Sequence, residues 1–215
     1  MEKLKEFMRS PKKTAILGFV SSILMILNVF LNNNHSLLSL LFQFSSKLFI
    51  FGFALYFLII LLRLVKNIGN IKIANYFLII SFIIPILIEV FIIIKYQINI
   101  KGVIYLIVYI YLSYYLYNLL IKRNYKVNNI IFSAVLIGFV VYQMIYSIYC
   151  KNFIISAYNN FTQNLIMNIM YLIMKVSYVG IIPYFINYSK LLRERGKWNG
   201  KWWRIKSNGS WRYWE

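Results

Sequence analysis

Long apolar runs alternate with short polar segments along almost the whole chain. A helix needs about 20 predominantly apolar residues to cross the roughly 30 Å hydrocarbon core of a bilayer. Six runs reach or approach that length, at residues 14–31, 38–62, 74–94, 102–121, 129–149 and 165–189. The pattern therefore predicts an all-α integral membrane protein, folded as a bundle of six transmembrane helices.

The composition favours the same class of protein. The 215 residues are 61% hydrophobic and 13% charged, with a mean hydropathy of +0.66. An ordinary soluble domain has about 25% charged residues, so this chain has too few to cover a water-exposed surface. We therefore expect the lipid bilayer to be its main partner. A cleaved signal peptide is the alternative interpretation of run 14–31, although no small-x-small cleavage site follows it.

Basic residues gather on one side of the predicted bundle. The segments 1–13, 63–73, 122–128 and 190–215 hold five, three, three and eight Lys or Arg, nineteen together, whereas the opposite side holds three. The positive-inside rule places the richer side, and with it both termini, in the cytoplasm. The net charge of +19 is then mainly a topology signal. We expect contact with anionic lipid headgroups and no nucleic-acid partner.

This topology divides the chain into a basic cytoplasmic segment at 1–13, a transmembrane domain at 14–189 and a cytoplasmic aromatic-basic tail at 190–215. The tail contains all five tryptophans: Trp198, Trp202, Trp203, Trp211 and Trp214. The pair Asn208-Gly209 between runs of β-formers favours a short hairpin there. Tryptophan mixed with Lys and Arg is typical of segments at an anionic membrane surface, and docking onto a partner protein is the alternative.

Three charged residues fall inside predicted spans. Lys47 precedes Arg63 by 16 residues, Glu89 follows Lys72 by 17 and Lys175 precedes Lys190 by 15. At 1.5 Å per residue, all three lie about 22–25 Å above the cytoplasmic side, so we predict a charged layer in the outer third of the bilayer.

A charge at mid-membrane costs roughly 2.5–3.5 kcal/mol, and pairing Glu89 with Lys47 or Lys175 would offset part of that. One interpretation is an ion pair that only fixes helix docking. A second has the lysines reaching outward and Glu89 close enough to the surface to be hydrated. The third is a polar cavity that holds an anionic solute, or in which Glu89 carries a proton or cation.

Two prolines interrupt predicted spans, Pro85 in FIIPILIE and Pro183 in GIIPYFIN. Each removes a backbone hydrogen bond one turn earlier, so we predict a kink in each helix. The similar motifs end the two three-span halves and would suit an inverted repeat, with two independent kinks as the alternative.

The residue types that usually carry catalysis are scarce. The chain has no Asp, one His (His35) and one Cys (Cys150), so we expect no catalytic site, no metal site and no cofactor. We predict a non-catalytic carrier or a subunit of a membrane transport or export complex. The alternative is a structural, assembly or immunity-type protein that acts through its tail. A composition rich in Ile, Asn, Lys, Tyr and Phe suggests a bacterial cell membrane, with an organellar membrane as the alternative.

Overall fold

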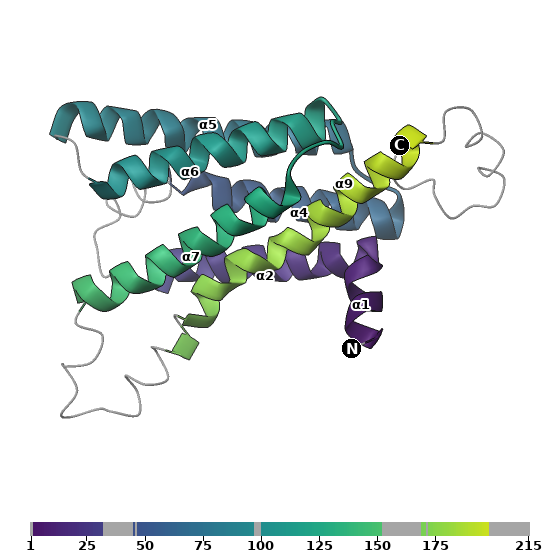
Figure 1. Cartoon of the computed structure of the whole chain (residues 1–215), viewed down its shortest axis with the longest axis horizontal. Helices are drawn as coiled ribbons and strands as arrows, with labels where there is room; N and C mark the ends of the chain where they lie inside the picture. Colours follow the sequence, from purple (N-terminus) through teal and green to yellow (C-terminus); the bar gives the residue numbers. More distant parts are fainter. Residues whose placement is uncertain are drawn as a thin grey trace.

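The computed structural model describes residues 2–31, 45, 47–96, 100–151, 169–170 and 172–197. Within these residues the chain forms helices joined by short turns, and no strand (Figure 1). The elements in order are α1 (Glu2–Arg9), α2 (Pro11–Leu31), α4 (Leu48–Lys66), α5 (Ile71–Tyr96), α6 (Ile100–Leu116), the π-turn η1 (Tyr117–Ile121), α7 (Asn129–Lys151), the 3₁₀ turn η2 (Ser177–Ile181) and α9 (Ile182–Lys197).

Within the described residues, four helices are long and apolar enough to cross a membrane: Pro11–Val29, Leu48–Lys66, Ile71–Lys95 and Ile100–Ile121. The apolar part of α7, Asn129–Ile145, is shorter. The prediction of an all-helical chain is confirmed for the described residues, and these four helices support the predicted membrane protein. The six crossings, the cytoplasmic termini and the tail hairpin stay predictions, and residues 198–215 lie outside the described part of the chain.

Several helix ends differ from the predicted spans because polar side chains cap them. Asn67 ends α4 in a left-handed conformation, φ 56°; its N–H donates to the carbonyl of Arg63 at 3.1 Å, and the N–H of Ile68 donates to the carbonyl of Leu62 at 3.4 Å. The side chain of Asn70 accepts the N–H of Lys72 at 3.0 Å and so caps the start of α5. The basic residues predicted to lie in loops therefore continue the helices: α4 extends to Lys66 and α5 starts before Lys72.

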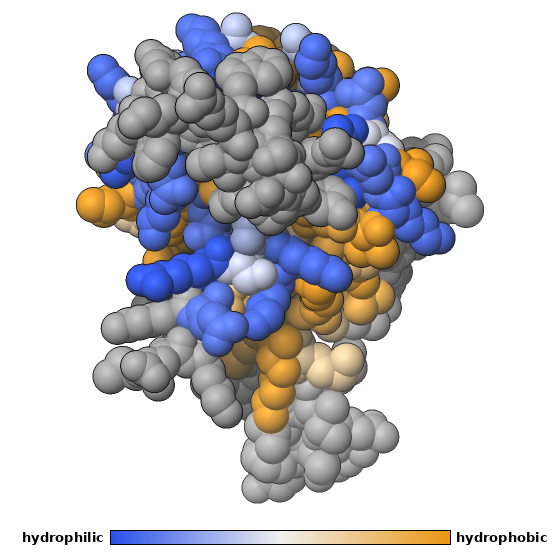
Figure 2. Space-filling model, turned by 90° about the vertical axis from the view of Figure 1, so that its right-hand side faces the viewer, coloured by the Kyte–Doolittle hydropathy of each residue, from blue (hydrophilic) through white to orange (hydrophobic). Residues whose placement is uncertain are grey.

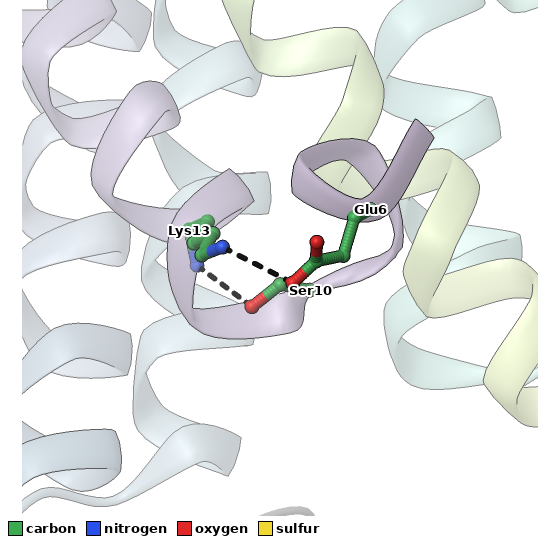
Figure 3. A network of polar contacts seen from close by, with 3 residues as sticks. All are labelled: Glu6, Ser10 and Lys13. Atoms are coloured by element: carbon green, nitrogen blue, oxygen red, sulfur yellow. Dashed lines mark hydrogen bonds and ion pairs between the residues drawn. The ribbon is translucent and has the colours of Figure 1, made fainter. Parts of the chain in front are cut away.

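The junction between α1 and α2 is capped in the same way (Figure 3). Ser10 accepts the N–H of Lys13 on its hydroxyl at 3.4 Å, and Pro11 occupies the first position of α2, where no donor is needed. Lys13 also reaches Glu6 of α1 at 3.7 Å, although both side chains are exposed and the pair contributes little. The predicted N-terminal basic segment thus contains a separate short helix.

The helices present apolar side chains outward and bury polar ones, the reverse of a soluble protein. On α5 the exposed residues Ile73, Phe77, Ile80, Ile84, Leu87, Phe91 and Ile94 recur at alternate spacings of three and four. That spacing is one continuous helix face. Thr14, Ser21, Ser22, Asn75, Ser81 and Asn118 are buried instead. Such a surface suits lipid, because hydrocarbon requires apolar contact and internally satisfied polar groups.

Small residues set the spacing between helices, as is common in membranes. A Cβ at Gly52 of α4 would lie 2.5 Å from the Cβ of Ser81 on α5. A Cβ at Gly180 of η2 would meet the Cβ of Ser21 on α2 at 3.0 Å. A Cβ at Gly18 of α2 would overlap the ring of Phe57 on α4. Each of these contacts therefore requires glycine.

Aromatic side chains fill the centre of the bundle. Phe53 contacts Phe82 at 5.5 Å and Phe185 at 6.1 Å between ring centroids, which joins α4, α5 and α9. Tyr56 and Tyr184, both fully buried, place their hydroxyl oxygens 3.4 Å apart. These contacts bring the last described helix against α4 although more than a hundred residues separate them in the sequence.

The two prolines have different local structures. Pro85 is buried within the uninterrupted helix α5. Pro183 follows η2, and the N–H of Ile182 donates to the carbonyl of Val179, so the chain tightens to a 3₁₀ turn before α9 begins. The backbone around the two motifs is therefore not the same, and the predicted inverted repeat receives no support from it.

One end of the bundle is basic. In Figure 1, α1, the 67–70 turn, the 122–128 turn and the end of α9 lie toward the right-hand side. Figure 2 views that end and shows hydrophilic side chains gathered over it, with apolar ones along its margins. Its exposed residues include Lys12, Lys66, Lys72, Lys122, Arg123, Lys126, Lys190 and Arg193. We call this surface the basic end.

Candidate functional site

Glu89 lies toward the end of α5 that is remote from the basic end. The side chain of Glu89 is half-buried. Leu87 and Phe91, two residues to either side, belong to the exposed apolar face of α5. Two residues correspond to about 200° of rotation, so Glu89 lies on the opposite side of the helix. Its carboxylate faces the start of α6, where Oε2 would lie 3.6 Å from a Cβ at Gly102. The missing side chain of Gly102 therefore leaves room for the carboxylate between α5 and α6.

Lys101 of α6 is the residue next to Gly102, which faces the carboxylate of Glu89. Lys101 Nζ is 5.8 Å from the ring centroid of Tyr105, a cation–π contact. Tyr109 of α6 is buried, with its ring 4.9 Å from that of Phe49 on α4.

Lys175 lies in the segment that precedes η2 and contacts α7. Its Nζ donates to the side-chain oxygen of Gln143 on α7 at 2.9 Å, and Gln143 is buried. Tyr105 connects α7 with the surroundings of Glu89, because its ring packs 5.2 Å from Phe139. We call the group Glu89, Lys101, Tyr105, Tyr109, Gln143 and Lys175 the outer polar cluster; it comes from α5, α6, α7 and the segment before η2.

Lys47 immediately precedes α4, whose first residue is Leu48. It is half-buried, and its carbonyl accepts the N–H of Ile50 at 2.9 Å. Lys47 is therefore at a helix end, whereas the predicted span 38–62 put it within a helix; residues 38–44 lie outside the described residues. The three members of the predicted layer thus lie immediately before α4, within α5 and in the segment before η2.

The sequence identified Glu89 and Lys175 but not their neighbours in the cluster. Lys101 was assigned to the side with few cations, yet α6 already begins at Ile100 and so carries Lys101 in its first turn. Gln143 was expected only as one of several polar residues that bridge helices. The sequence feature that could have indicated a neighbour of Glu89 is the pair Lys101-Gly102, because a glycine next to a lysine leaves space for an acidic side chain of another helix. The pairing of Glu89 with Lys47 or Lys175 stays a prediction.

A second polar region lies near the basic end and contains no formal charge. Tyr115 of α6 donates to Asn129 of α7 at 2.7 Å, and Asn129 donates to Ser189 of α9 at 2.6 Å. Asn187 of α9 donates to the carbonyl of Met8 in α1. These contacts join four helices through neutral groups. We call Tyr115, Asn129 and Ser189 the neutral seam.

The chemistry available at the outer polar cluster is ion or solute binding. Lysine ammonium groups and tyrosine hydroxyls can donate to an anion, and the carboxylate can accept from a cation or a proton donor. Among the described residues no group of three or more His, Cys, Asp or Glu could hold a metal ion. The tryptophans Trp198, Trp202, Trp203, Trp211 and Trp214 lie outside the described residues, and so does His35.

Comparison with known proteins gave no further guide to function. No protein-family model, curated protein or solved structure matches this chain.

Proposed function

We propose that this chain is a small non-catalytic membrane protein with six crossings and cytoplasmic termini. It acts as a carrier or as a subunit of a membrane transport or export complex, most simply in a bacterial cell membrane. The outer polar cluster is the part that meets the transported solute. The bilayer is its first partner, and other membrane proteins are partners if it works as a subunit.

The observation that carries the proposal is the position of Glu89. Its side chain is half-buried, is on the opposite side of α5 from the apolar face and faces the glycine of α6. A buried structural ion pair would be shielded from solute, and a lipid-facing carboxylate would be neutralised or expelled. A half-buried carboxylate next to the start of α6 can instead exchange its partner for a passing ion.

Substituting Glu89→Gln tests the proposal. It keeps the shape of the side chain and removes its charge, so expression and helix content should stay unchanged while transport falls to background. The matched control is Glu194→Gln, which removes the same charge from an exposed position on α9. The measurement compares the ion and small-solute content of cells that carry each variant. Equal activity of the two variants would remove Glu89 from the mechanism.

The alternative function through the tail is separated by a second variant. Deleting residues 198–215 should leave solute movement intact if the outer polar cluster is the working part. Loss of function on deletion, together with an active Glu89→Gln variant, favours a structural, assembly or immunity-type role. Purification in mild detergent then identifies the proteins or solutes that accompany the chain.

A further inference from the structure

A compact group of cations lies at one corner of the basic end, where α5 begins and α6 ends. The side chain of Asn75 on α5 donates to the carbonyl of Leu120 in η1 at 3.2 Å, so these two positions face each other. α5 and α6 run in opposite directions. One turn closer to the basic end than Asn75 is Lys72 on α5, and one turn closer than Leu120 are Lys122 and Arg123, so the three cations lie at the same level. All three side chains are exposed.

The backbone fixes the direction of two of these cations. In η1 the N–H of Lys122 donates to the carbonyl of Tyr117 at 3.1 Å, five residues earlier. In a regular α-helix two residues five apart are about 140° apart around the axis, and a π-turn reduces that angle. Lys122 therefore lies over the ring of Tyr117, with Nζ 5.3 Å from its centroid.

Arg123 continues this turn in the left-handed conformation, with φ 51°. This region is sparsely populated by residues other than glycine, asparagine and aspartate. The N–H of Asn124 donates to the carbonyl of Asn118 at 2.9 Å and closes the turn around it. Arg123 is thus held next to Lys122 at the exposed corner.

Two further features point to a ligand with both a charged and an apolar part. Stretches 63–76 and 117–128 contain no Asp or Glu, so neither stretch supplies a counter-charge to these cations. Directly toward the centre of the bundle, Tyr76 is 56% exposed and Tyr117 is 41% exposed. The exposed apolar face of α5 begins at Ile73 and continues past Tyr76 with Phe77 and Ile80.

We infer that this corner binds an anionic phospholipid. Lys72, Lys122 and Arg123 hold the headgroup phosphate, Tyr76 and Tyr117 lie at the level of the glycerol, and the acyl chains follow the apolar face of α5. Basic pockets between helices on the cytoplasmic side recognise acidic headgroups in this way, and tyrosine is common at that depth. A free phosphate would use the cations but neither the tyrosines nor the apolar face. The inference rests on the bilayer placement in the proposed function and not on transport.

The test removes three charges from this corner or three from elsewhere on the same end. The corner variant is Lys72→Gln/Lys122→Gln/Arg123→Gln, and the control variant is Arg9→Gln/Lys12→Gln/Lys190→Gln, all at exposed positions. Each purified protein is mixed with detergent micelles containing phosphatidylcholine and phosphatidylglycerol, and native mass spectrometry measures how much phosphatidylglycerol stays bound.

We expect the corner variant to bind phosphatidylglycerol on the order of a hundredfold more weakly than the unchanged protein. The control variant should lose far less. Equal losses from both variants would show a general surface charge effect and overturn the site, as would displacement of the lipid by inorganic phosphate at low concentration.

Two further variants separate the possible causes of failure. The single change Lys72→Gln should already weaken binding about fivefold if the triple variant does not fold; unchanged binding by a folded Lys72→Gln protein counts against the site. Glu89→Gln should bind phosphatidylglycerol normally even where transport is lost. If the unchanged protein transports nothing but retains phosphatidylglycerol, the proposed carrier is contradicted and the lipid site stands.

Discussion

The neutral seam and the outer polar cluster join helices with different chemistry. In the neutral seam, Tyr115, Asn129 and Ser189 connect α6, α7 and α9 through hydrogen bonds of 2.7 and 2.6 Å. In the outer polar cluster, Glu89, Lys101 and Lys175 bring formal charges to half-buried positions on α5, on α6 and before η2.

The difference shows that neutral groups are sufficient to join helices in one part of this protein. Hydrogen bonds between neutral groups in membranes contribute about 0.6 kcal/mol each on average, whereas a charge near mid-membrane costs roughly 2.5–3.5 kcal/mol. If the outer polar cluster only held helices together, neutral residues such as those of the neutral seam would do so at a lower cost in free energy. Stability and activity should therefore respond to different substitutions.

The largest loss of stability is expected from a substitution at Gly52, where α4 packs closely against α5. Gly52→Ala places a methyl group 2.5 Å from the Cβ of Ser81 and forces α4 away from α5. We expect a loss of about 1–3 kcal/mol in the free energy of unfolding, measured by denaturant titration in detergent. The matched control is Gly138→Ala on α7, where a Cβ has nothing within 4 Å. Similar losses at both glycines would mean that the contact with Ser81 does not set the helix spacing.

A smaller effect is expected within the neutral seam. Asn129→Leu removes the acceptor of Tyr115 and the donor to Ser189, which should lower the free energy of unfolding by about 1–2 kcal/mol. Transport should persist in the molecules that remain folded. Tyr115→Phe should cost nothing further in the Asn129→Leu background, and a full additional loss would place the tyrosine hydroxyl in some other contact.

The smallest change in stability is expected at the outer polar cluster. Gly102→Ala puts a methyl group at ordinary contact distance, 3.6 Å, from the carboxylate of Glu89. The free energy of unfolding should change by less than about 1 kcal/mol. Solute transport should nevertheless weaken severalfold, because the carboxylate loses room on its α6 side. Unchanged transport kinetics would argue that solute does not enter between α5 and α6.

The sequence predicts the helices well because twenty consecutive apolar residues have few other stable structures in lipid. It predicts helix ends and neighbours less well. The start of α6 at Ile100 depends on local backbone geometry, so Lys101 was assigned to a loop. The contact between Gly52 and Ser81 depends on two small residues in different helices, and no periodic pattern marks such a pair. The tail lies outside the described residues, and its predicted hairpin stays a prediction.

The close contact between Gly180 of η2 and Ser21 of α2 has a consequence for biosynthesis. The ribosome makes α2 near the beginning of the chain and η2 near the end, about 160 residues later. Until η2 is made, the surface of α2 around Ser21 lacks the contact with Gly180, and lipid or the insertion machinery must cover that surface. α2 can therefore pack on α4 early but gains its contact with η2 only much later, and a ribosome that stalls between the two elements leaves that face of α2 uncovered.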